Sequence, residues 1–230
     1  MINRERLRFE LLMDAGNGAQ KAGDILIKVF AKSGRFVFIE PLIPAEISPP
    51  KRTPHSLSGA VIRVANQELT NIGSSSDVMV VEHEILLKRR YEDKEYSEGG
   101  VIYLDMGEQK RNPDAYEEVL SYGKKEGLTI IPFTIDENSL TTIKSLGGNG
   151  KNMYYLGLLG SIFNLEKSAL ELTIRGTFKK LSVEKLDQNI SIFYSGFDYG
   201  ASIVADPYEI ARADAKENSI LLDGNTAMAM

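Results

Sequence analysis

The chain has 230 residues, of which 43% are hydrophobic, and it contains no cysteine. The length suits one large α/β domain with or without a short extra piece. The lack of cysteine excludes disulfides, thiolate zinc sites, cysteine-ligated iron–sulfur clusters and thiol nucleophiles. A net charge of −5 and a pI of about 5.3 argue against a dedicated nucleic-acid binder. The N-terminal segment is not typical of a secretory signal and the apolar runs are too short to span a membrane, so we expect a cytoplasmic protein.

The chain opens with a strand, a turn, a helix and a second strand. Residues 8–14 contain an apolar run and predict the first strand. Apolar residues then recur at spacings of three and four over residues 19–32, which predicts a helix, and Ser33-Gly34 is typical of a helix end. Residues 35–40 predict the second strand. This order makes a βαβ unit, and such units build parallel sheets.

A proline-rich segment follows the second strand. Residues 41–54 contain five prolines, and proline is incompatible with a helix interior or a central strand. We therefore expect a long, exposed and stiff loop. Residues 58–66 then alternate as a strand does.

The remaining pattern completes an α/β fold. The further elements expected are, in chain order, an apolar strand at 78–82 buried on both faces, a short helix at 84–91, a buried strand at 101–105, a helix at 113–125 capped by Asn112, a last strand at 128–133, and three helices at 152–163, 166–178 and 183–201. The first of these three helices is apolar on almost every face, so we expect it to be buried. The expected fold is a three-layer α/β/α arrangement with a mainly parallel, Rossmann-like sheet and a helical C-terminal region. A polar stretch at 206–218 then leads to residues 219–230, which look like a strand, a turn and the start of a helix.

The first candidate site is the turn Gly16-Asn17-Gly18-Ala19-Gln20, between the first strand and the first helix. Backbone amides at such a helix N-terminus bind phosphate or pyrophosphate groups. The turn has the G-x-G of a dinucleotide fingerprint but not its third glycine, and Glu40 ends the second strand, where a ribose-binding acid would lie. The alternative is that the glycines only make a tight turn.

The second candidate site is the proline-rich loop with Lys51, Arg52, His55 and Ser56. Two cations and a histidine on a stiff loop suit an anionic ligand or a partner subunit. The alternative is a solvated surface loop. His55 and His83 are the only histidines, and neither has the spacing of a metal site, so we expect no bound metal. The G-x-S-x-G elbow of a hydrolase is also missing, and the sequence assigns no catalytic residue.

Several segments together resemble one known family. Residues 14–26 are similar to a G-x-G-G-Q-G turn followed by an A-G-x-I-L helix, and residues 44–47 to a P-x-E-(I/M) loop. Residues 152–157 resemble an asparagine-led late helix, which is followed by a helix ending in a segment like 175–180. These are features of the gamma domain of the 2-oxoacid:ferredoxin oxidoreductases. Residues 223–229 resemble the start of the thiamine diphosphate pyrimidine-binding domain, which follows the gamma domain in 2-oxoglutarate-type alpha subunits.

The resemblance implies a gamma domain over residues 1–202, a linker over 203–218 and the start of a truncated pyrimidine-binding domain over 219–230. It implies a part in the oxidative decarboxylation of a 2-oxo acid to acyl-coenzyme A, with ferredoxin taking the electrons. Thiamine diphosphate, Mg²⁺ and an iron–sulfur cluster are implied in partner domains, coenzyme A is implied as a substrate, and this chain alone is expected to bind no cofactor and to be inactive. The expected partners are the other alpha-subunit domains, beta subunits and ferredoxin.

The family also implies contact roles for eight residues. Contacts with coenzyme A through main-chain amides are implied for four residues of the turn, Gly16, Asn17, Gly18 and Gln20. Contacts with a partner domain or with the phosphates of the ligand are implied for four residues of the loop, Pro44, Glu46, Lys51 and Arg52. No proton donor or nucleophile is implied in this chain.

The sequence departs from the family pattern at the turn. Ala19 replaces the second adjacent glycine, the glycine after Gln20 is missing, and the segment is about three residues shorter than the family pattern. Residues 49–52 replace a glycine-rich segment after the P-x-E-I loop. Two alternatives therefore stay open, a stand-alone nucleotide-binding Rossmann-like module and an interaction scaffold with an inactive turn.

Overall fold

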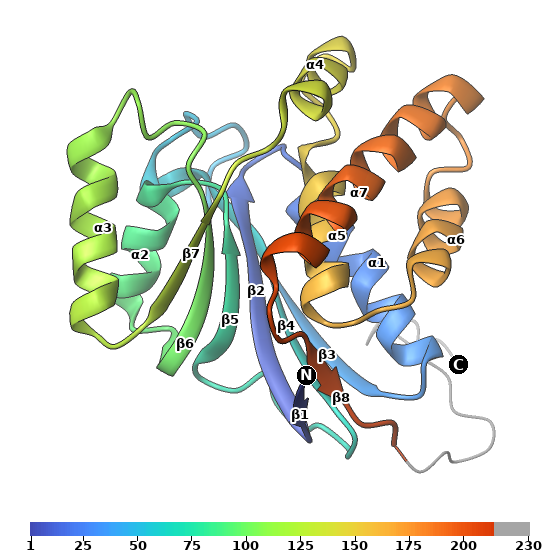
Figure 1. Cartoon of the computed structure of the whole chain (residues 1–230), viewed down its shortest axis with the longest axis horizontal. Helices are drawn as coiled ribbons and strands as arrows, with labels where there is room; N and C mark the ends of the chain where they lie inside the picture. The colour runs from blue at the N-terminus through green and yellow to red at the C-terminus, as the bar shows by residue number, and fades with distance from the viewer. Residues whose placement is uncertain (214–230) are drawn as a thin grey trace.

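The computed structural model describes residues 1–213, in which a mixed six-stranded sheet carries helices on both faces (Figure 1). The strands lie in the order β3–β4–β2–β5–β6–β7. Their bounds are β2 Arg6–Asp14, β3 Phe36–Leu42, β4 Leu57–Ala65, β5 Ser76–Val81, β6 Tyr96–Asp105 and β7 Thr129–Phe133. The predicted three-layer α/β/α architecture with a helical C-terminal region is confirmed.

Strand direction divides the sheet into two parts. β2, β5, β6 and β7 pair as parallel neighbours, with Leu11 opposite Val80 in the first pair. β4 is antiparallel to both β2 and β3, and Ala60 lies opposite Leu11. Hence β3 runs in the same direction as β2 but does not pair with it. The prediction of a mainly parallel sheet is confirmed, and β4 inserts between the two strands of the predicted βαβ unit.

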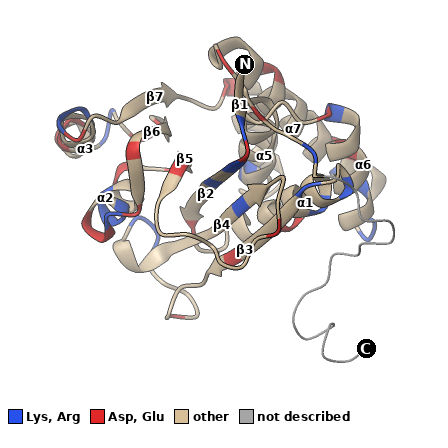
Figure 2. Ribbon diagram, turned by 90° about the horizontal axis from the view of Figure 1, so that it is seen from below, with Lys and Arg blue, Asp and Glu red and all other residues tan. Residues whose placement is uncertain are grey.

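Two helical layers enclose the sheet, and Figure 2 shows them on opposite sides of it. One layer contains α2 (Glu84–Asp93) and α3 (Pro113–Lys125), which pack on Leu12, Met79 and Leu104. The other layer consists of α1 (Ala19–Lys32), α4 (Glu137–Ser145), α5 (Lys151–Ile162), α6 (Lys167–Thr177) and α7 (Val183–Ile203). Each layer therefore covers its own hydrophobic core.

The predicted buried helix is α5, which lies between the sheet and α7. Every residue from Asn152 to Ile162 is buried. Glycine permits the close crossing of α5 and α7, because a Cβ on Gly196 would lie 2.1 Å from the Tyr154 carbonyl oxygen. Burial of α5 fixes its first turn next to the carboxyl end of β2.

Some elements differ from the sequence prediction. β3 continues through Pro41 to Leu42, which is tolerated because β3 is an edge strand. Residues 43–53 form the expected loop, and a short 3₁₀-helix follows at Pro54–Ser56. α4 was not predicted, nor were β1 (Ile2–Arg4) and β8 (Tyr208–Ile210), which pair in parallel.

β8 lies within the expected linker of residues 203–218, and the described part of the chain ends at residue 213. The expected start of a pyrimidine-binding domain at 219–230 lies outside the described residues. Among the helices of residues 1–213, none has the length and apolar character needed to cross a membrane.

Candidate functional site

The glycine turn lies at the carboxyl end of β2, between this strand and the N-terminus of α1. Gly16 and Gly18 have φ angles of 85° and 87°, a left-handed conformation that glycine adopts without strain. The Asn17 amide donates to the Asp14 carbonyl at 3.0 Å and closes the turn. Gly18 is the N-cap of α1 and supplies no side-chain cap, so the first amides of the helix lack intrahelical partners. The prediction that this turn joins a strand to a helix is confirmed.

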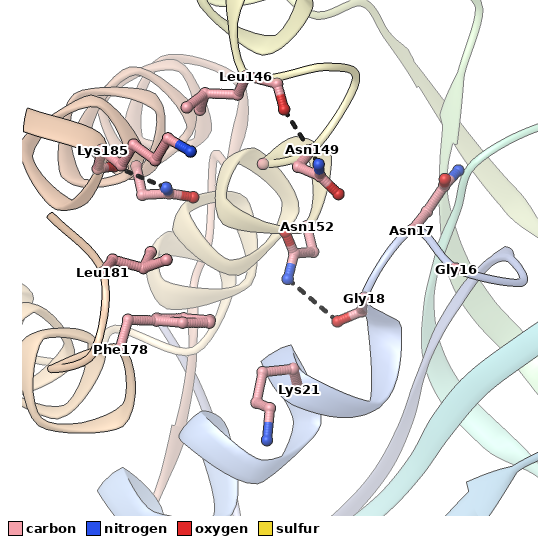
Figure 3. A pocket seen from close by; sticks show the side chains of 12 residues that line it. Gly16, Asn17, Gly18, Lys21, Leu146, Asn149, Asn152, Phe178, Leu181 and Lys185 are labelled. Carbon is pink, nitrogen blue, oxygen red and sulfur yellow. Dashed lines mark hydrogen bonds between the residues drawn. The ribbon is translucent and has the colours of Figure 1, made fainter.

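The turn packs against the first residues of α5. Asn152 donates from Nδ2 to the Gly18 carbonyl oxygen at 3.1 Å (Figure 3). A Cβ atom on Gly18 would lie 2.6 Å from the same Nδ2, whereas a Cβ on Gly16 would have no atom within 4 Å. Position 18 therefore needs glycine for two reasons, the left-handed backbone conformation and the lack of room for a Cβ atom. Position 16 needs glycine for its backbone conformation alone.

A pocket of about 320 Å³ opens beside the turn. It is lined by the turn, by the loop between α4 and α5, and by α7 and the segment before it. Its lining residues include Gly16, Asn17, Gly18, Lys21, Asn149, Asn152, Phe178, Leu181, Lys185 and Asn189. Of the two lysines that line it, Figure 3 shows Lys21 on α1 and Lys185 on α7. Helix amides with two lysines attract an anion, and Phe178 and Leu181 offer an apolar surface.

Three carboxylates lie beneath the turn, each at the carboxyl end of a neighbouring strand. They are Asp14 at the end of β2, Glu82 just after β5 and Asp105 at the end of β6. All three are almost completely buried. In parallel sheets the crevice at this edge is the usual ligand site.

Glu82 connects the turn to α5. Its carboxylate accepts hydrogen bonds from the Asp14 amide at 2.7 Å and from Asn17 Nδ2 at 2.8 Å. Lys151 Nζ donates to it at 2.8 Å and lies 3.6 Å from Asp105 Oδ2. Burial lowers the pKa of Lys151, but the two carboxylates outweigh burial and hold that pKa above its usual value.

Asp105 lies deepest in this group. Tyr155 donates to its Oδ2 at 2.6 Å and the Gly107 amide to its Oδ1 at 2.8 Å. Burial raises the pKa of Asp105 above its usual value, and Lys151 and Tyr155 oppose that rise only in part. Burial therefore penalises the ionised form of Asp105.

Asp14 connects the turn to the proline-rich loop. Its carboxylate accepts hydrogen bonds from the Arg52 amide at 3.1 Å and from Ser56 Oγ at 2.5 Å, and lies 3.0 Å from His83 Nε2. Burial raises the pKa of Asp14, but the hydrogen bonds from His83 and Ser56 outweigh burial and bring that pKa below its usual value. The Arg52 guanidinium pairs with Glu84 at 2.5 Å.

The structure thus brings most of the predicted residues together. Lys51 Nζ lies 3.3 Å from Asn17 Oδ1, so the loop meets the turn directly. Gln20 points elsewhere and donates to the Leu42 carbonyl at 3.4 Å. Pro44 is half-buried and Glu46 is exposed further along the loop.

One other sequence indication is resolved by the geometry. Glu40 is exposed on β3, which β4 separates from β2, so the strand next to the turn is not the one that carries this acid. The dinucleotide-binding arrangement needs that acid on the neighbouring parallel strand. Within residues 1–213 no group of three or more histidine, aspartate and glutamate side chains is suited to hold a metal ion.

Sequence reasoning missed the buried polar residues of the site, which are Glu82, Glu84, Asp105 and Lys151, together with Asp14 as the residue that joins turn and loop. A signal was present, because an acidic residue ends or directly follows each of three apolar strands. Side chains at that position in a parallel sheet gather at one edge.

A comparison with protein families matches residues 14–199 to the family described as pyruvate ferredoxin/flavodoxin oxidoreductase. The chain belongs to this family. A curated relative from Mycobacterium tuberculosis, 2-oxoglutarate oxidoreductase subunit KorA, is 28% identical over 229 residues, which are 94% of this chain and 35% of KorA.

Solved structures show the same fold. The 2-oxoglutarate:ferredoxin oxidoreductase of Magnetococcus marinus, with 2-oxoglutarate, coenzyme A and succinyl-CoA bound, has a TM-score of 0.72 at 22% identity, over 92% of this chain and 34% of that one. The keto/oxoacid ferredoxin oxidoreductase gamma subunit of Geobacter sulfurreducens has a TM-score of 0.60 at 15% identity, over 87% of this chain and 99% of that one. Subunit PORC of pyruvate oxidoreductase from Thermotoga maritima has a TM-score of 0.60 at 21% identity, over 85% of this chain and 97% of that one. The chain spans about a third of the two long relatives and nearly all of the two short ones.

Proposed function

We propose that this chain serves as the gamma domain of a 2-oxoacid:ferredoxin oxidoreductase. Family membership over residues 14–199 supports this, as does a fold shared over nearly the full length of a gamma subunit. The reaction proposed for the assembly is oxidative decarboxylation of a 2-oxo acid to acyl-coenzyme A. Ferredoxin would accept the electrons.

The cofactors of that reaction are proposed to lie in partner domains. The chain has no cysteine with which to ligate an iron–sulfur cluster. Thiamine diphosphate with Mg²⁺ would belong to the other alpha-subunit domains or the beta subunit. In the two long relatives about two thirds of the chain lies beyond the matched part. We propose that residues 219–230 begin such a domain. They follow the proposed linker of residues 203–218, within which β8 pairs with β1.

The role proposed for this chain is to form one wall of the coenzyme A approach. The carrying observation is the junction of turn and loop, where Lys51 donates to Asn17 and the Arg52 amide donates to Asp14. In the adjoining pocket Lys21 and Lys185 supply positive charge, and Phe178 supplies an apolar surface. Such a wall suits a ligand with both phosphates and apolar parts, and the Magnetococcus relative holds coenzyme A.

Purification of a tagged copy from its own cell, with mass spectrometry of the partners, tests the assembly. The expected partners are a thiamine-binding polypeptide and one that carries a cysteine-ligated cluster, unless one longer chain contains both. A chain that purifies alone and binds a nucleotide tightly would instead support a stand-alone nucleotide-binding module.

Kinetics of the assembled enzyme test the coenzyme A wall. Lys21→Ala and Lys185→Ala are each expected to raise the KM for coenzyme A about three- to tenfold, the loss of one charge-assisted contact, with kcat little changed. Lys28→Ala is the matched control, because Lys28 is exposed on the same helix as Lys21 but does not line the pocket. An unchanged KM in both pocket variants would support the interaction-scaffold alternative.

A further inference from the structure

The loop between β3 and the 3₁₀-helix presents two large apolar side chains to solvent. Ile43 is 70% exposed and Ile47 is fully exposed, at 103%. Ala45 and Glu46 between them are exposed as well. Two isoleucines in this position add nothing to the protein's own core, and such a group of exposed apolar residues typically marks a contact surface.

The two ends of the loop are held by the rest of the domain. Its start continues β3, where Leu42 pairs with Gly59 of β4. Its end is fixed by the Arg52 amide, which donates to Asp14, and by the Arg52 side chain, which pairs with the buried Glu84. Pro49 is buried between these points. A loop held in this way loses little conformational entropy when it binds.

The loop also lies at the functional edge of the sheet. β3 runs in the same direction as β2, so its carboxyl end, where the loop begins, lies on the same edge as Asp14, Glu82 and Asp105. A body that covers the two isoleucines therefore binds at the edge of the sheet that carries the glycine turn. Two other exposed apolar residues, Leu172 on α6 and Val183 on α7, lie in the helical layer instead.

We propose that Ile43 and Ile47 are the anchors by which this domain docks onto the catalytic, thiamine-binding part of the oxidoreductase. The inference rests on the proposed function and names its contact surface. The partner must offer an apolar recess for Ile47, with a basic rim that faces Glu46. Two observations indicate this partner. In the two long relatives, two thirds of the chain lies outside the matched part and must fold beside it. The loop also begins at the edge of the sheet that carries the glycine turn.

The lack of cysteine makes a direct test simple, because Ile47→Cys introduces the only thiol of the chain. The assembled enzyme is treated with a maleimide, and labelling at position 47 is read by peptide mass spectrometry. Labelling at this position is expected to slow about tenfold or more on assembly, since a docked anchor is shielded from solvent. Leu172→Cys is the matched control, because Leu172 is 70% exposed, as Ile43 is, but lies on α6; its labelling rate is expected to stay unchanged.

Equal labelling at position 47 in the isolated chain and in the active complex would overturn the proposal. Protection of that thiol in the isolated chain at high concentration would also overturn it, because the occupant would then be a second copy. A wild-type chain that joins no thiamine-binding partner would refute the proposed function and, with it, the occupant named here.

A second variant measures the contribution to affinity. Ile47→Asp is expected to weaken assembly roughly tenfold or more, because an anchor residue is replaced by a charge that must be desolvated. Leu172→Asp is expected to leave assembly within about twofold, as for a residue outside the interface. Both positions are exposed, so circular dichroism of each isolated variant should match the wild type. Equal assembly by both variants would contradict the proposal.

Discussion

Replacing Gly18 with alanine is expected to destabilise the protein by roughly 1–5 kcal/mol. Alanine in the left-handed conformation costs roughly 1–2 kcal/mol, of which the less flexible unfolded chain offsets about 0.4–1 kcal/mol. The new Cβ would also lie 2.6 Å from Asn152 Nδ2, so Asn152 must move and lose its hydrogen bond to the Gly18 carbonyl. Because Asn152 is only 8% exposed, a lost partner adds about 1–3 kcal/mol.

Gly16→Ala separates the two contributions. Gly16 has nearly the same φ angle but no atom within 4 Å of a Cβ. Its substitution should therefore cost only the conformational part, roughly 1 kcal/mol. Urea denaturation of the purified chain, followed by circular dichroism, measures both. Combining Gly18→Ala with Asn152→Ala should cost less than the sum of the single changes, since the clash is relieved.

Equal destabilisation by Gly16→Ala and Gly18→Ala would refute this reasoning. It would mean that α5 does not press on the turn, and that the turn is fixed by its backbone conformation alone. Additive effects of Gly18→Ala and Asn152→Ala would lead to the same conclusion.

Three further changes test the buried site and the helix crossing. Lys151→Met should cost about 3 kcal/mol in the free energy of unfolding, because it leaves the carboxylate of Glu82 buried without its cation. Gly196→Ala should prevent folding, since its Cβ would lie 2.1 Å from a carbonyl oxygen of α5. The stability difference between wild type and Asp14→Asn should narrow as the pH falls below 3.8, the ordinary pKa of the group. The native pKa of Asp14 is lower still, so its stabilising effect is present above that value and is lost as pH falls through the native pKa.

Matched controls accompany these changes. Lys88→Met removes an ion pair whose two side chains are both more than half exposed, and should lower the free energy of unfolding far less than Lys151→Met does. Gly176→Ala, in α6 with open space around the new Cβ, should be neutral or stabilise by up to about 1 kcal/mol. Equal costs for the two lysine variants, a folded Gly196→Ala protein, or a pH-independent effect of Asp14→Asn would each contradict the corresponding argument.

Much of the fold could be predicted because its signals are local. The spacing of apolar residues in α1 and the uniformly apolar sequence of α5 both gave the correct helix, and α5 is buried as expected. The direction of β4 could not be predicted, since a strand carries the same alternation whichever way it runs. α4 was missed because only Ser139 and Ile143 of it are buried, which gives almost no periodicity. Its one local signal is Asp136, which caps the N-terminus of α4 by accepting a hydrogen bond from the Ser139 amide.

The candidate site was predictable only in part. Glycine spacing located the turn, and cations in the proline-rich loop indicated Lys51 and Arg52, which do lie beside it. The contact by which Asp14 joins the turn to the loop depends on tertiary structure, because Asp14 and Arg52 are 38 residues apart in the sequence. Lys151 is more remote still, and only the packing of α5 brings it to the strand ends.

The most direct test of the account is 2-oxo-acid-dependent reduction of a viologen dye, measured with and without coenzyme A. We expect no activity from the isolated chain, because the proposed function puts the thiamine diphosphate and the cluster in partner domains. Activity that depends on coenzyme A should appear when the partner domains are present. Turnover of a 2-oxo acid by the isolated chain, or a partner complex that works equally well without this chain, would contradict the account.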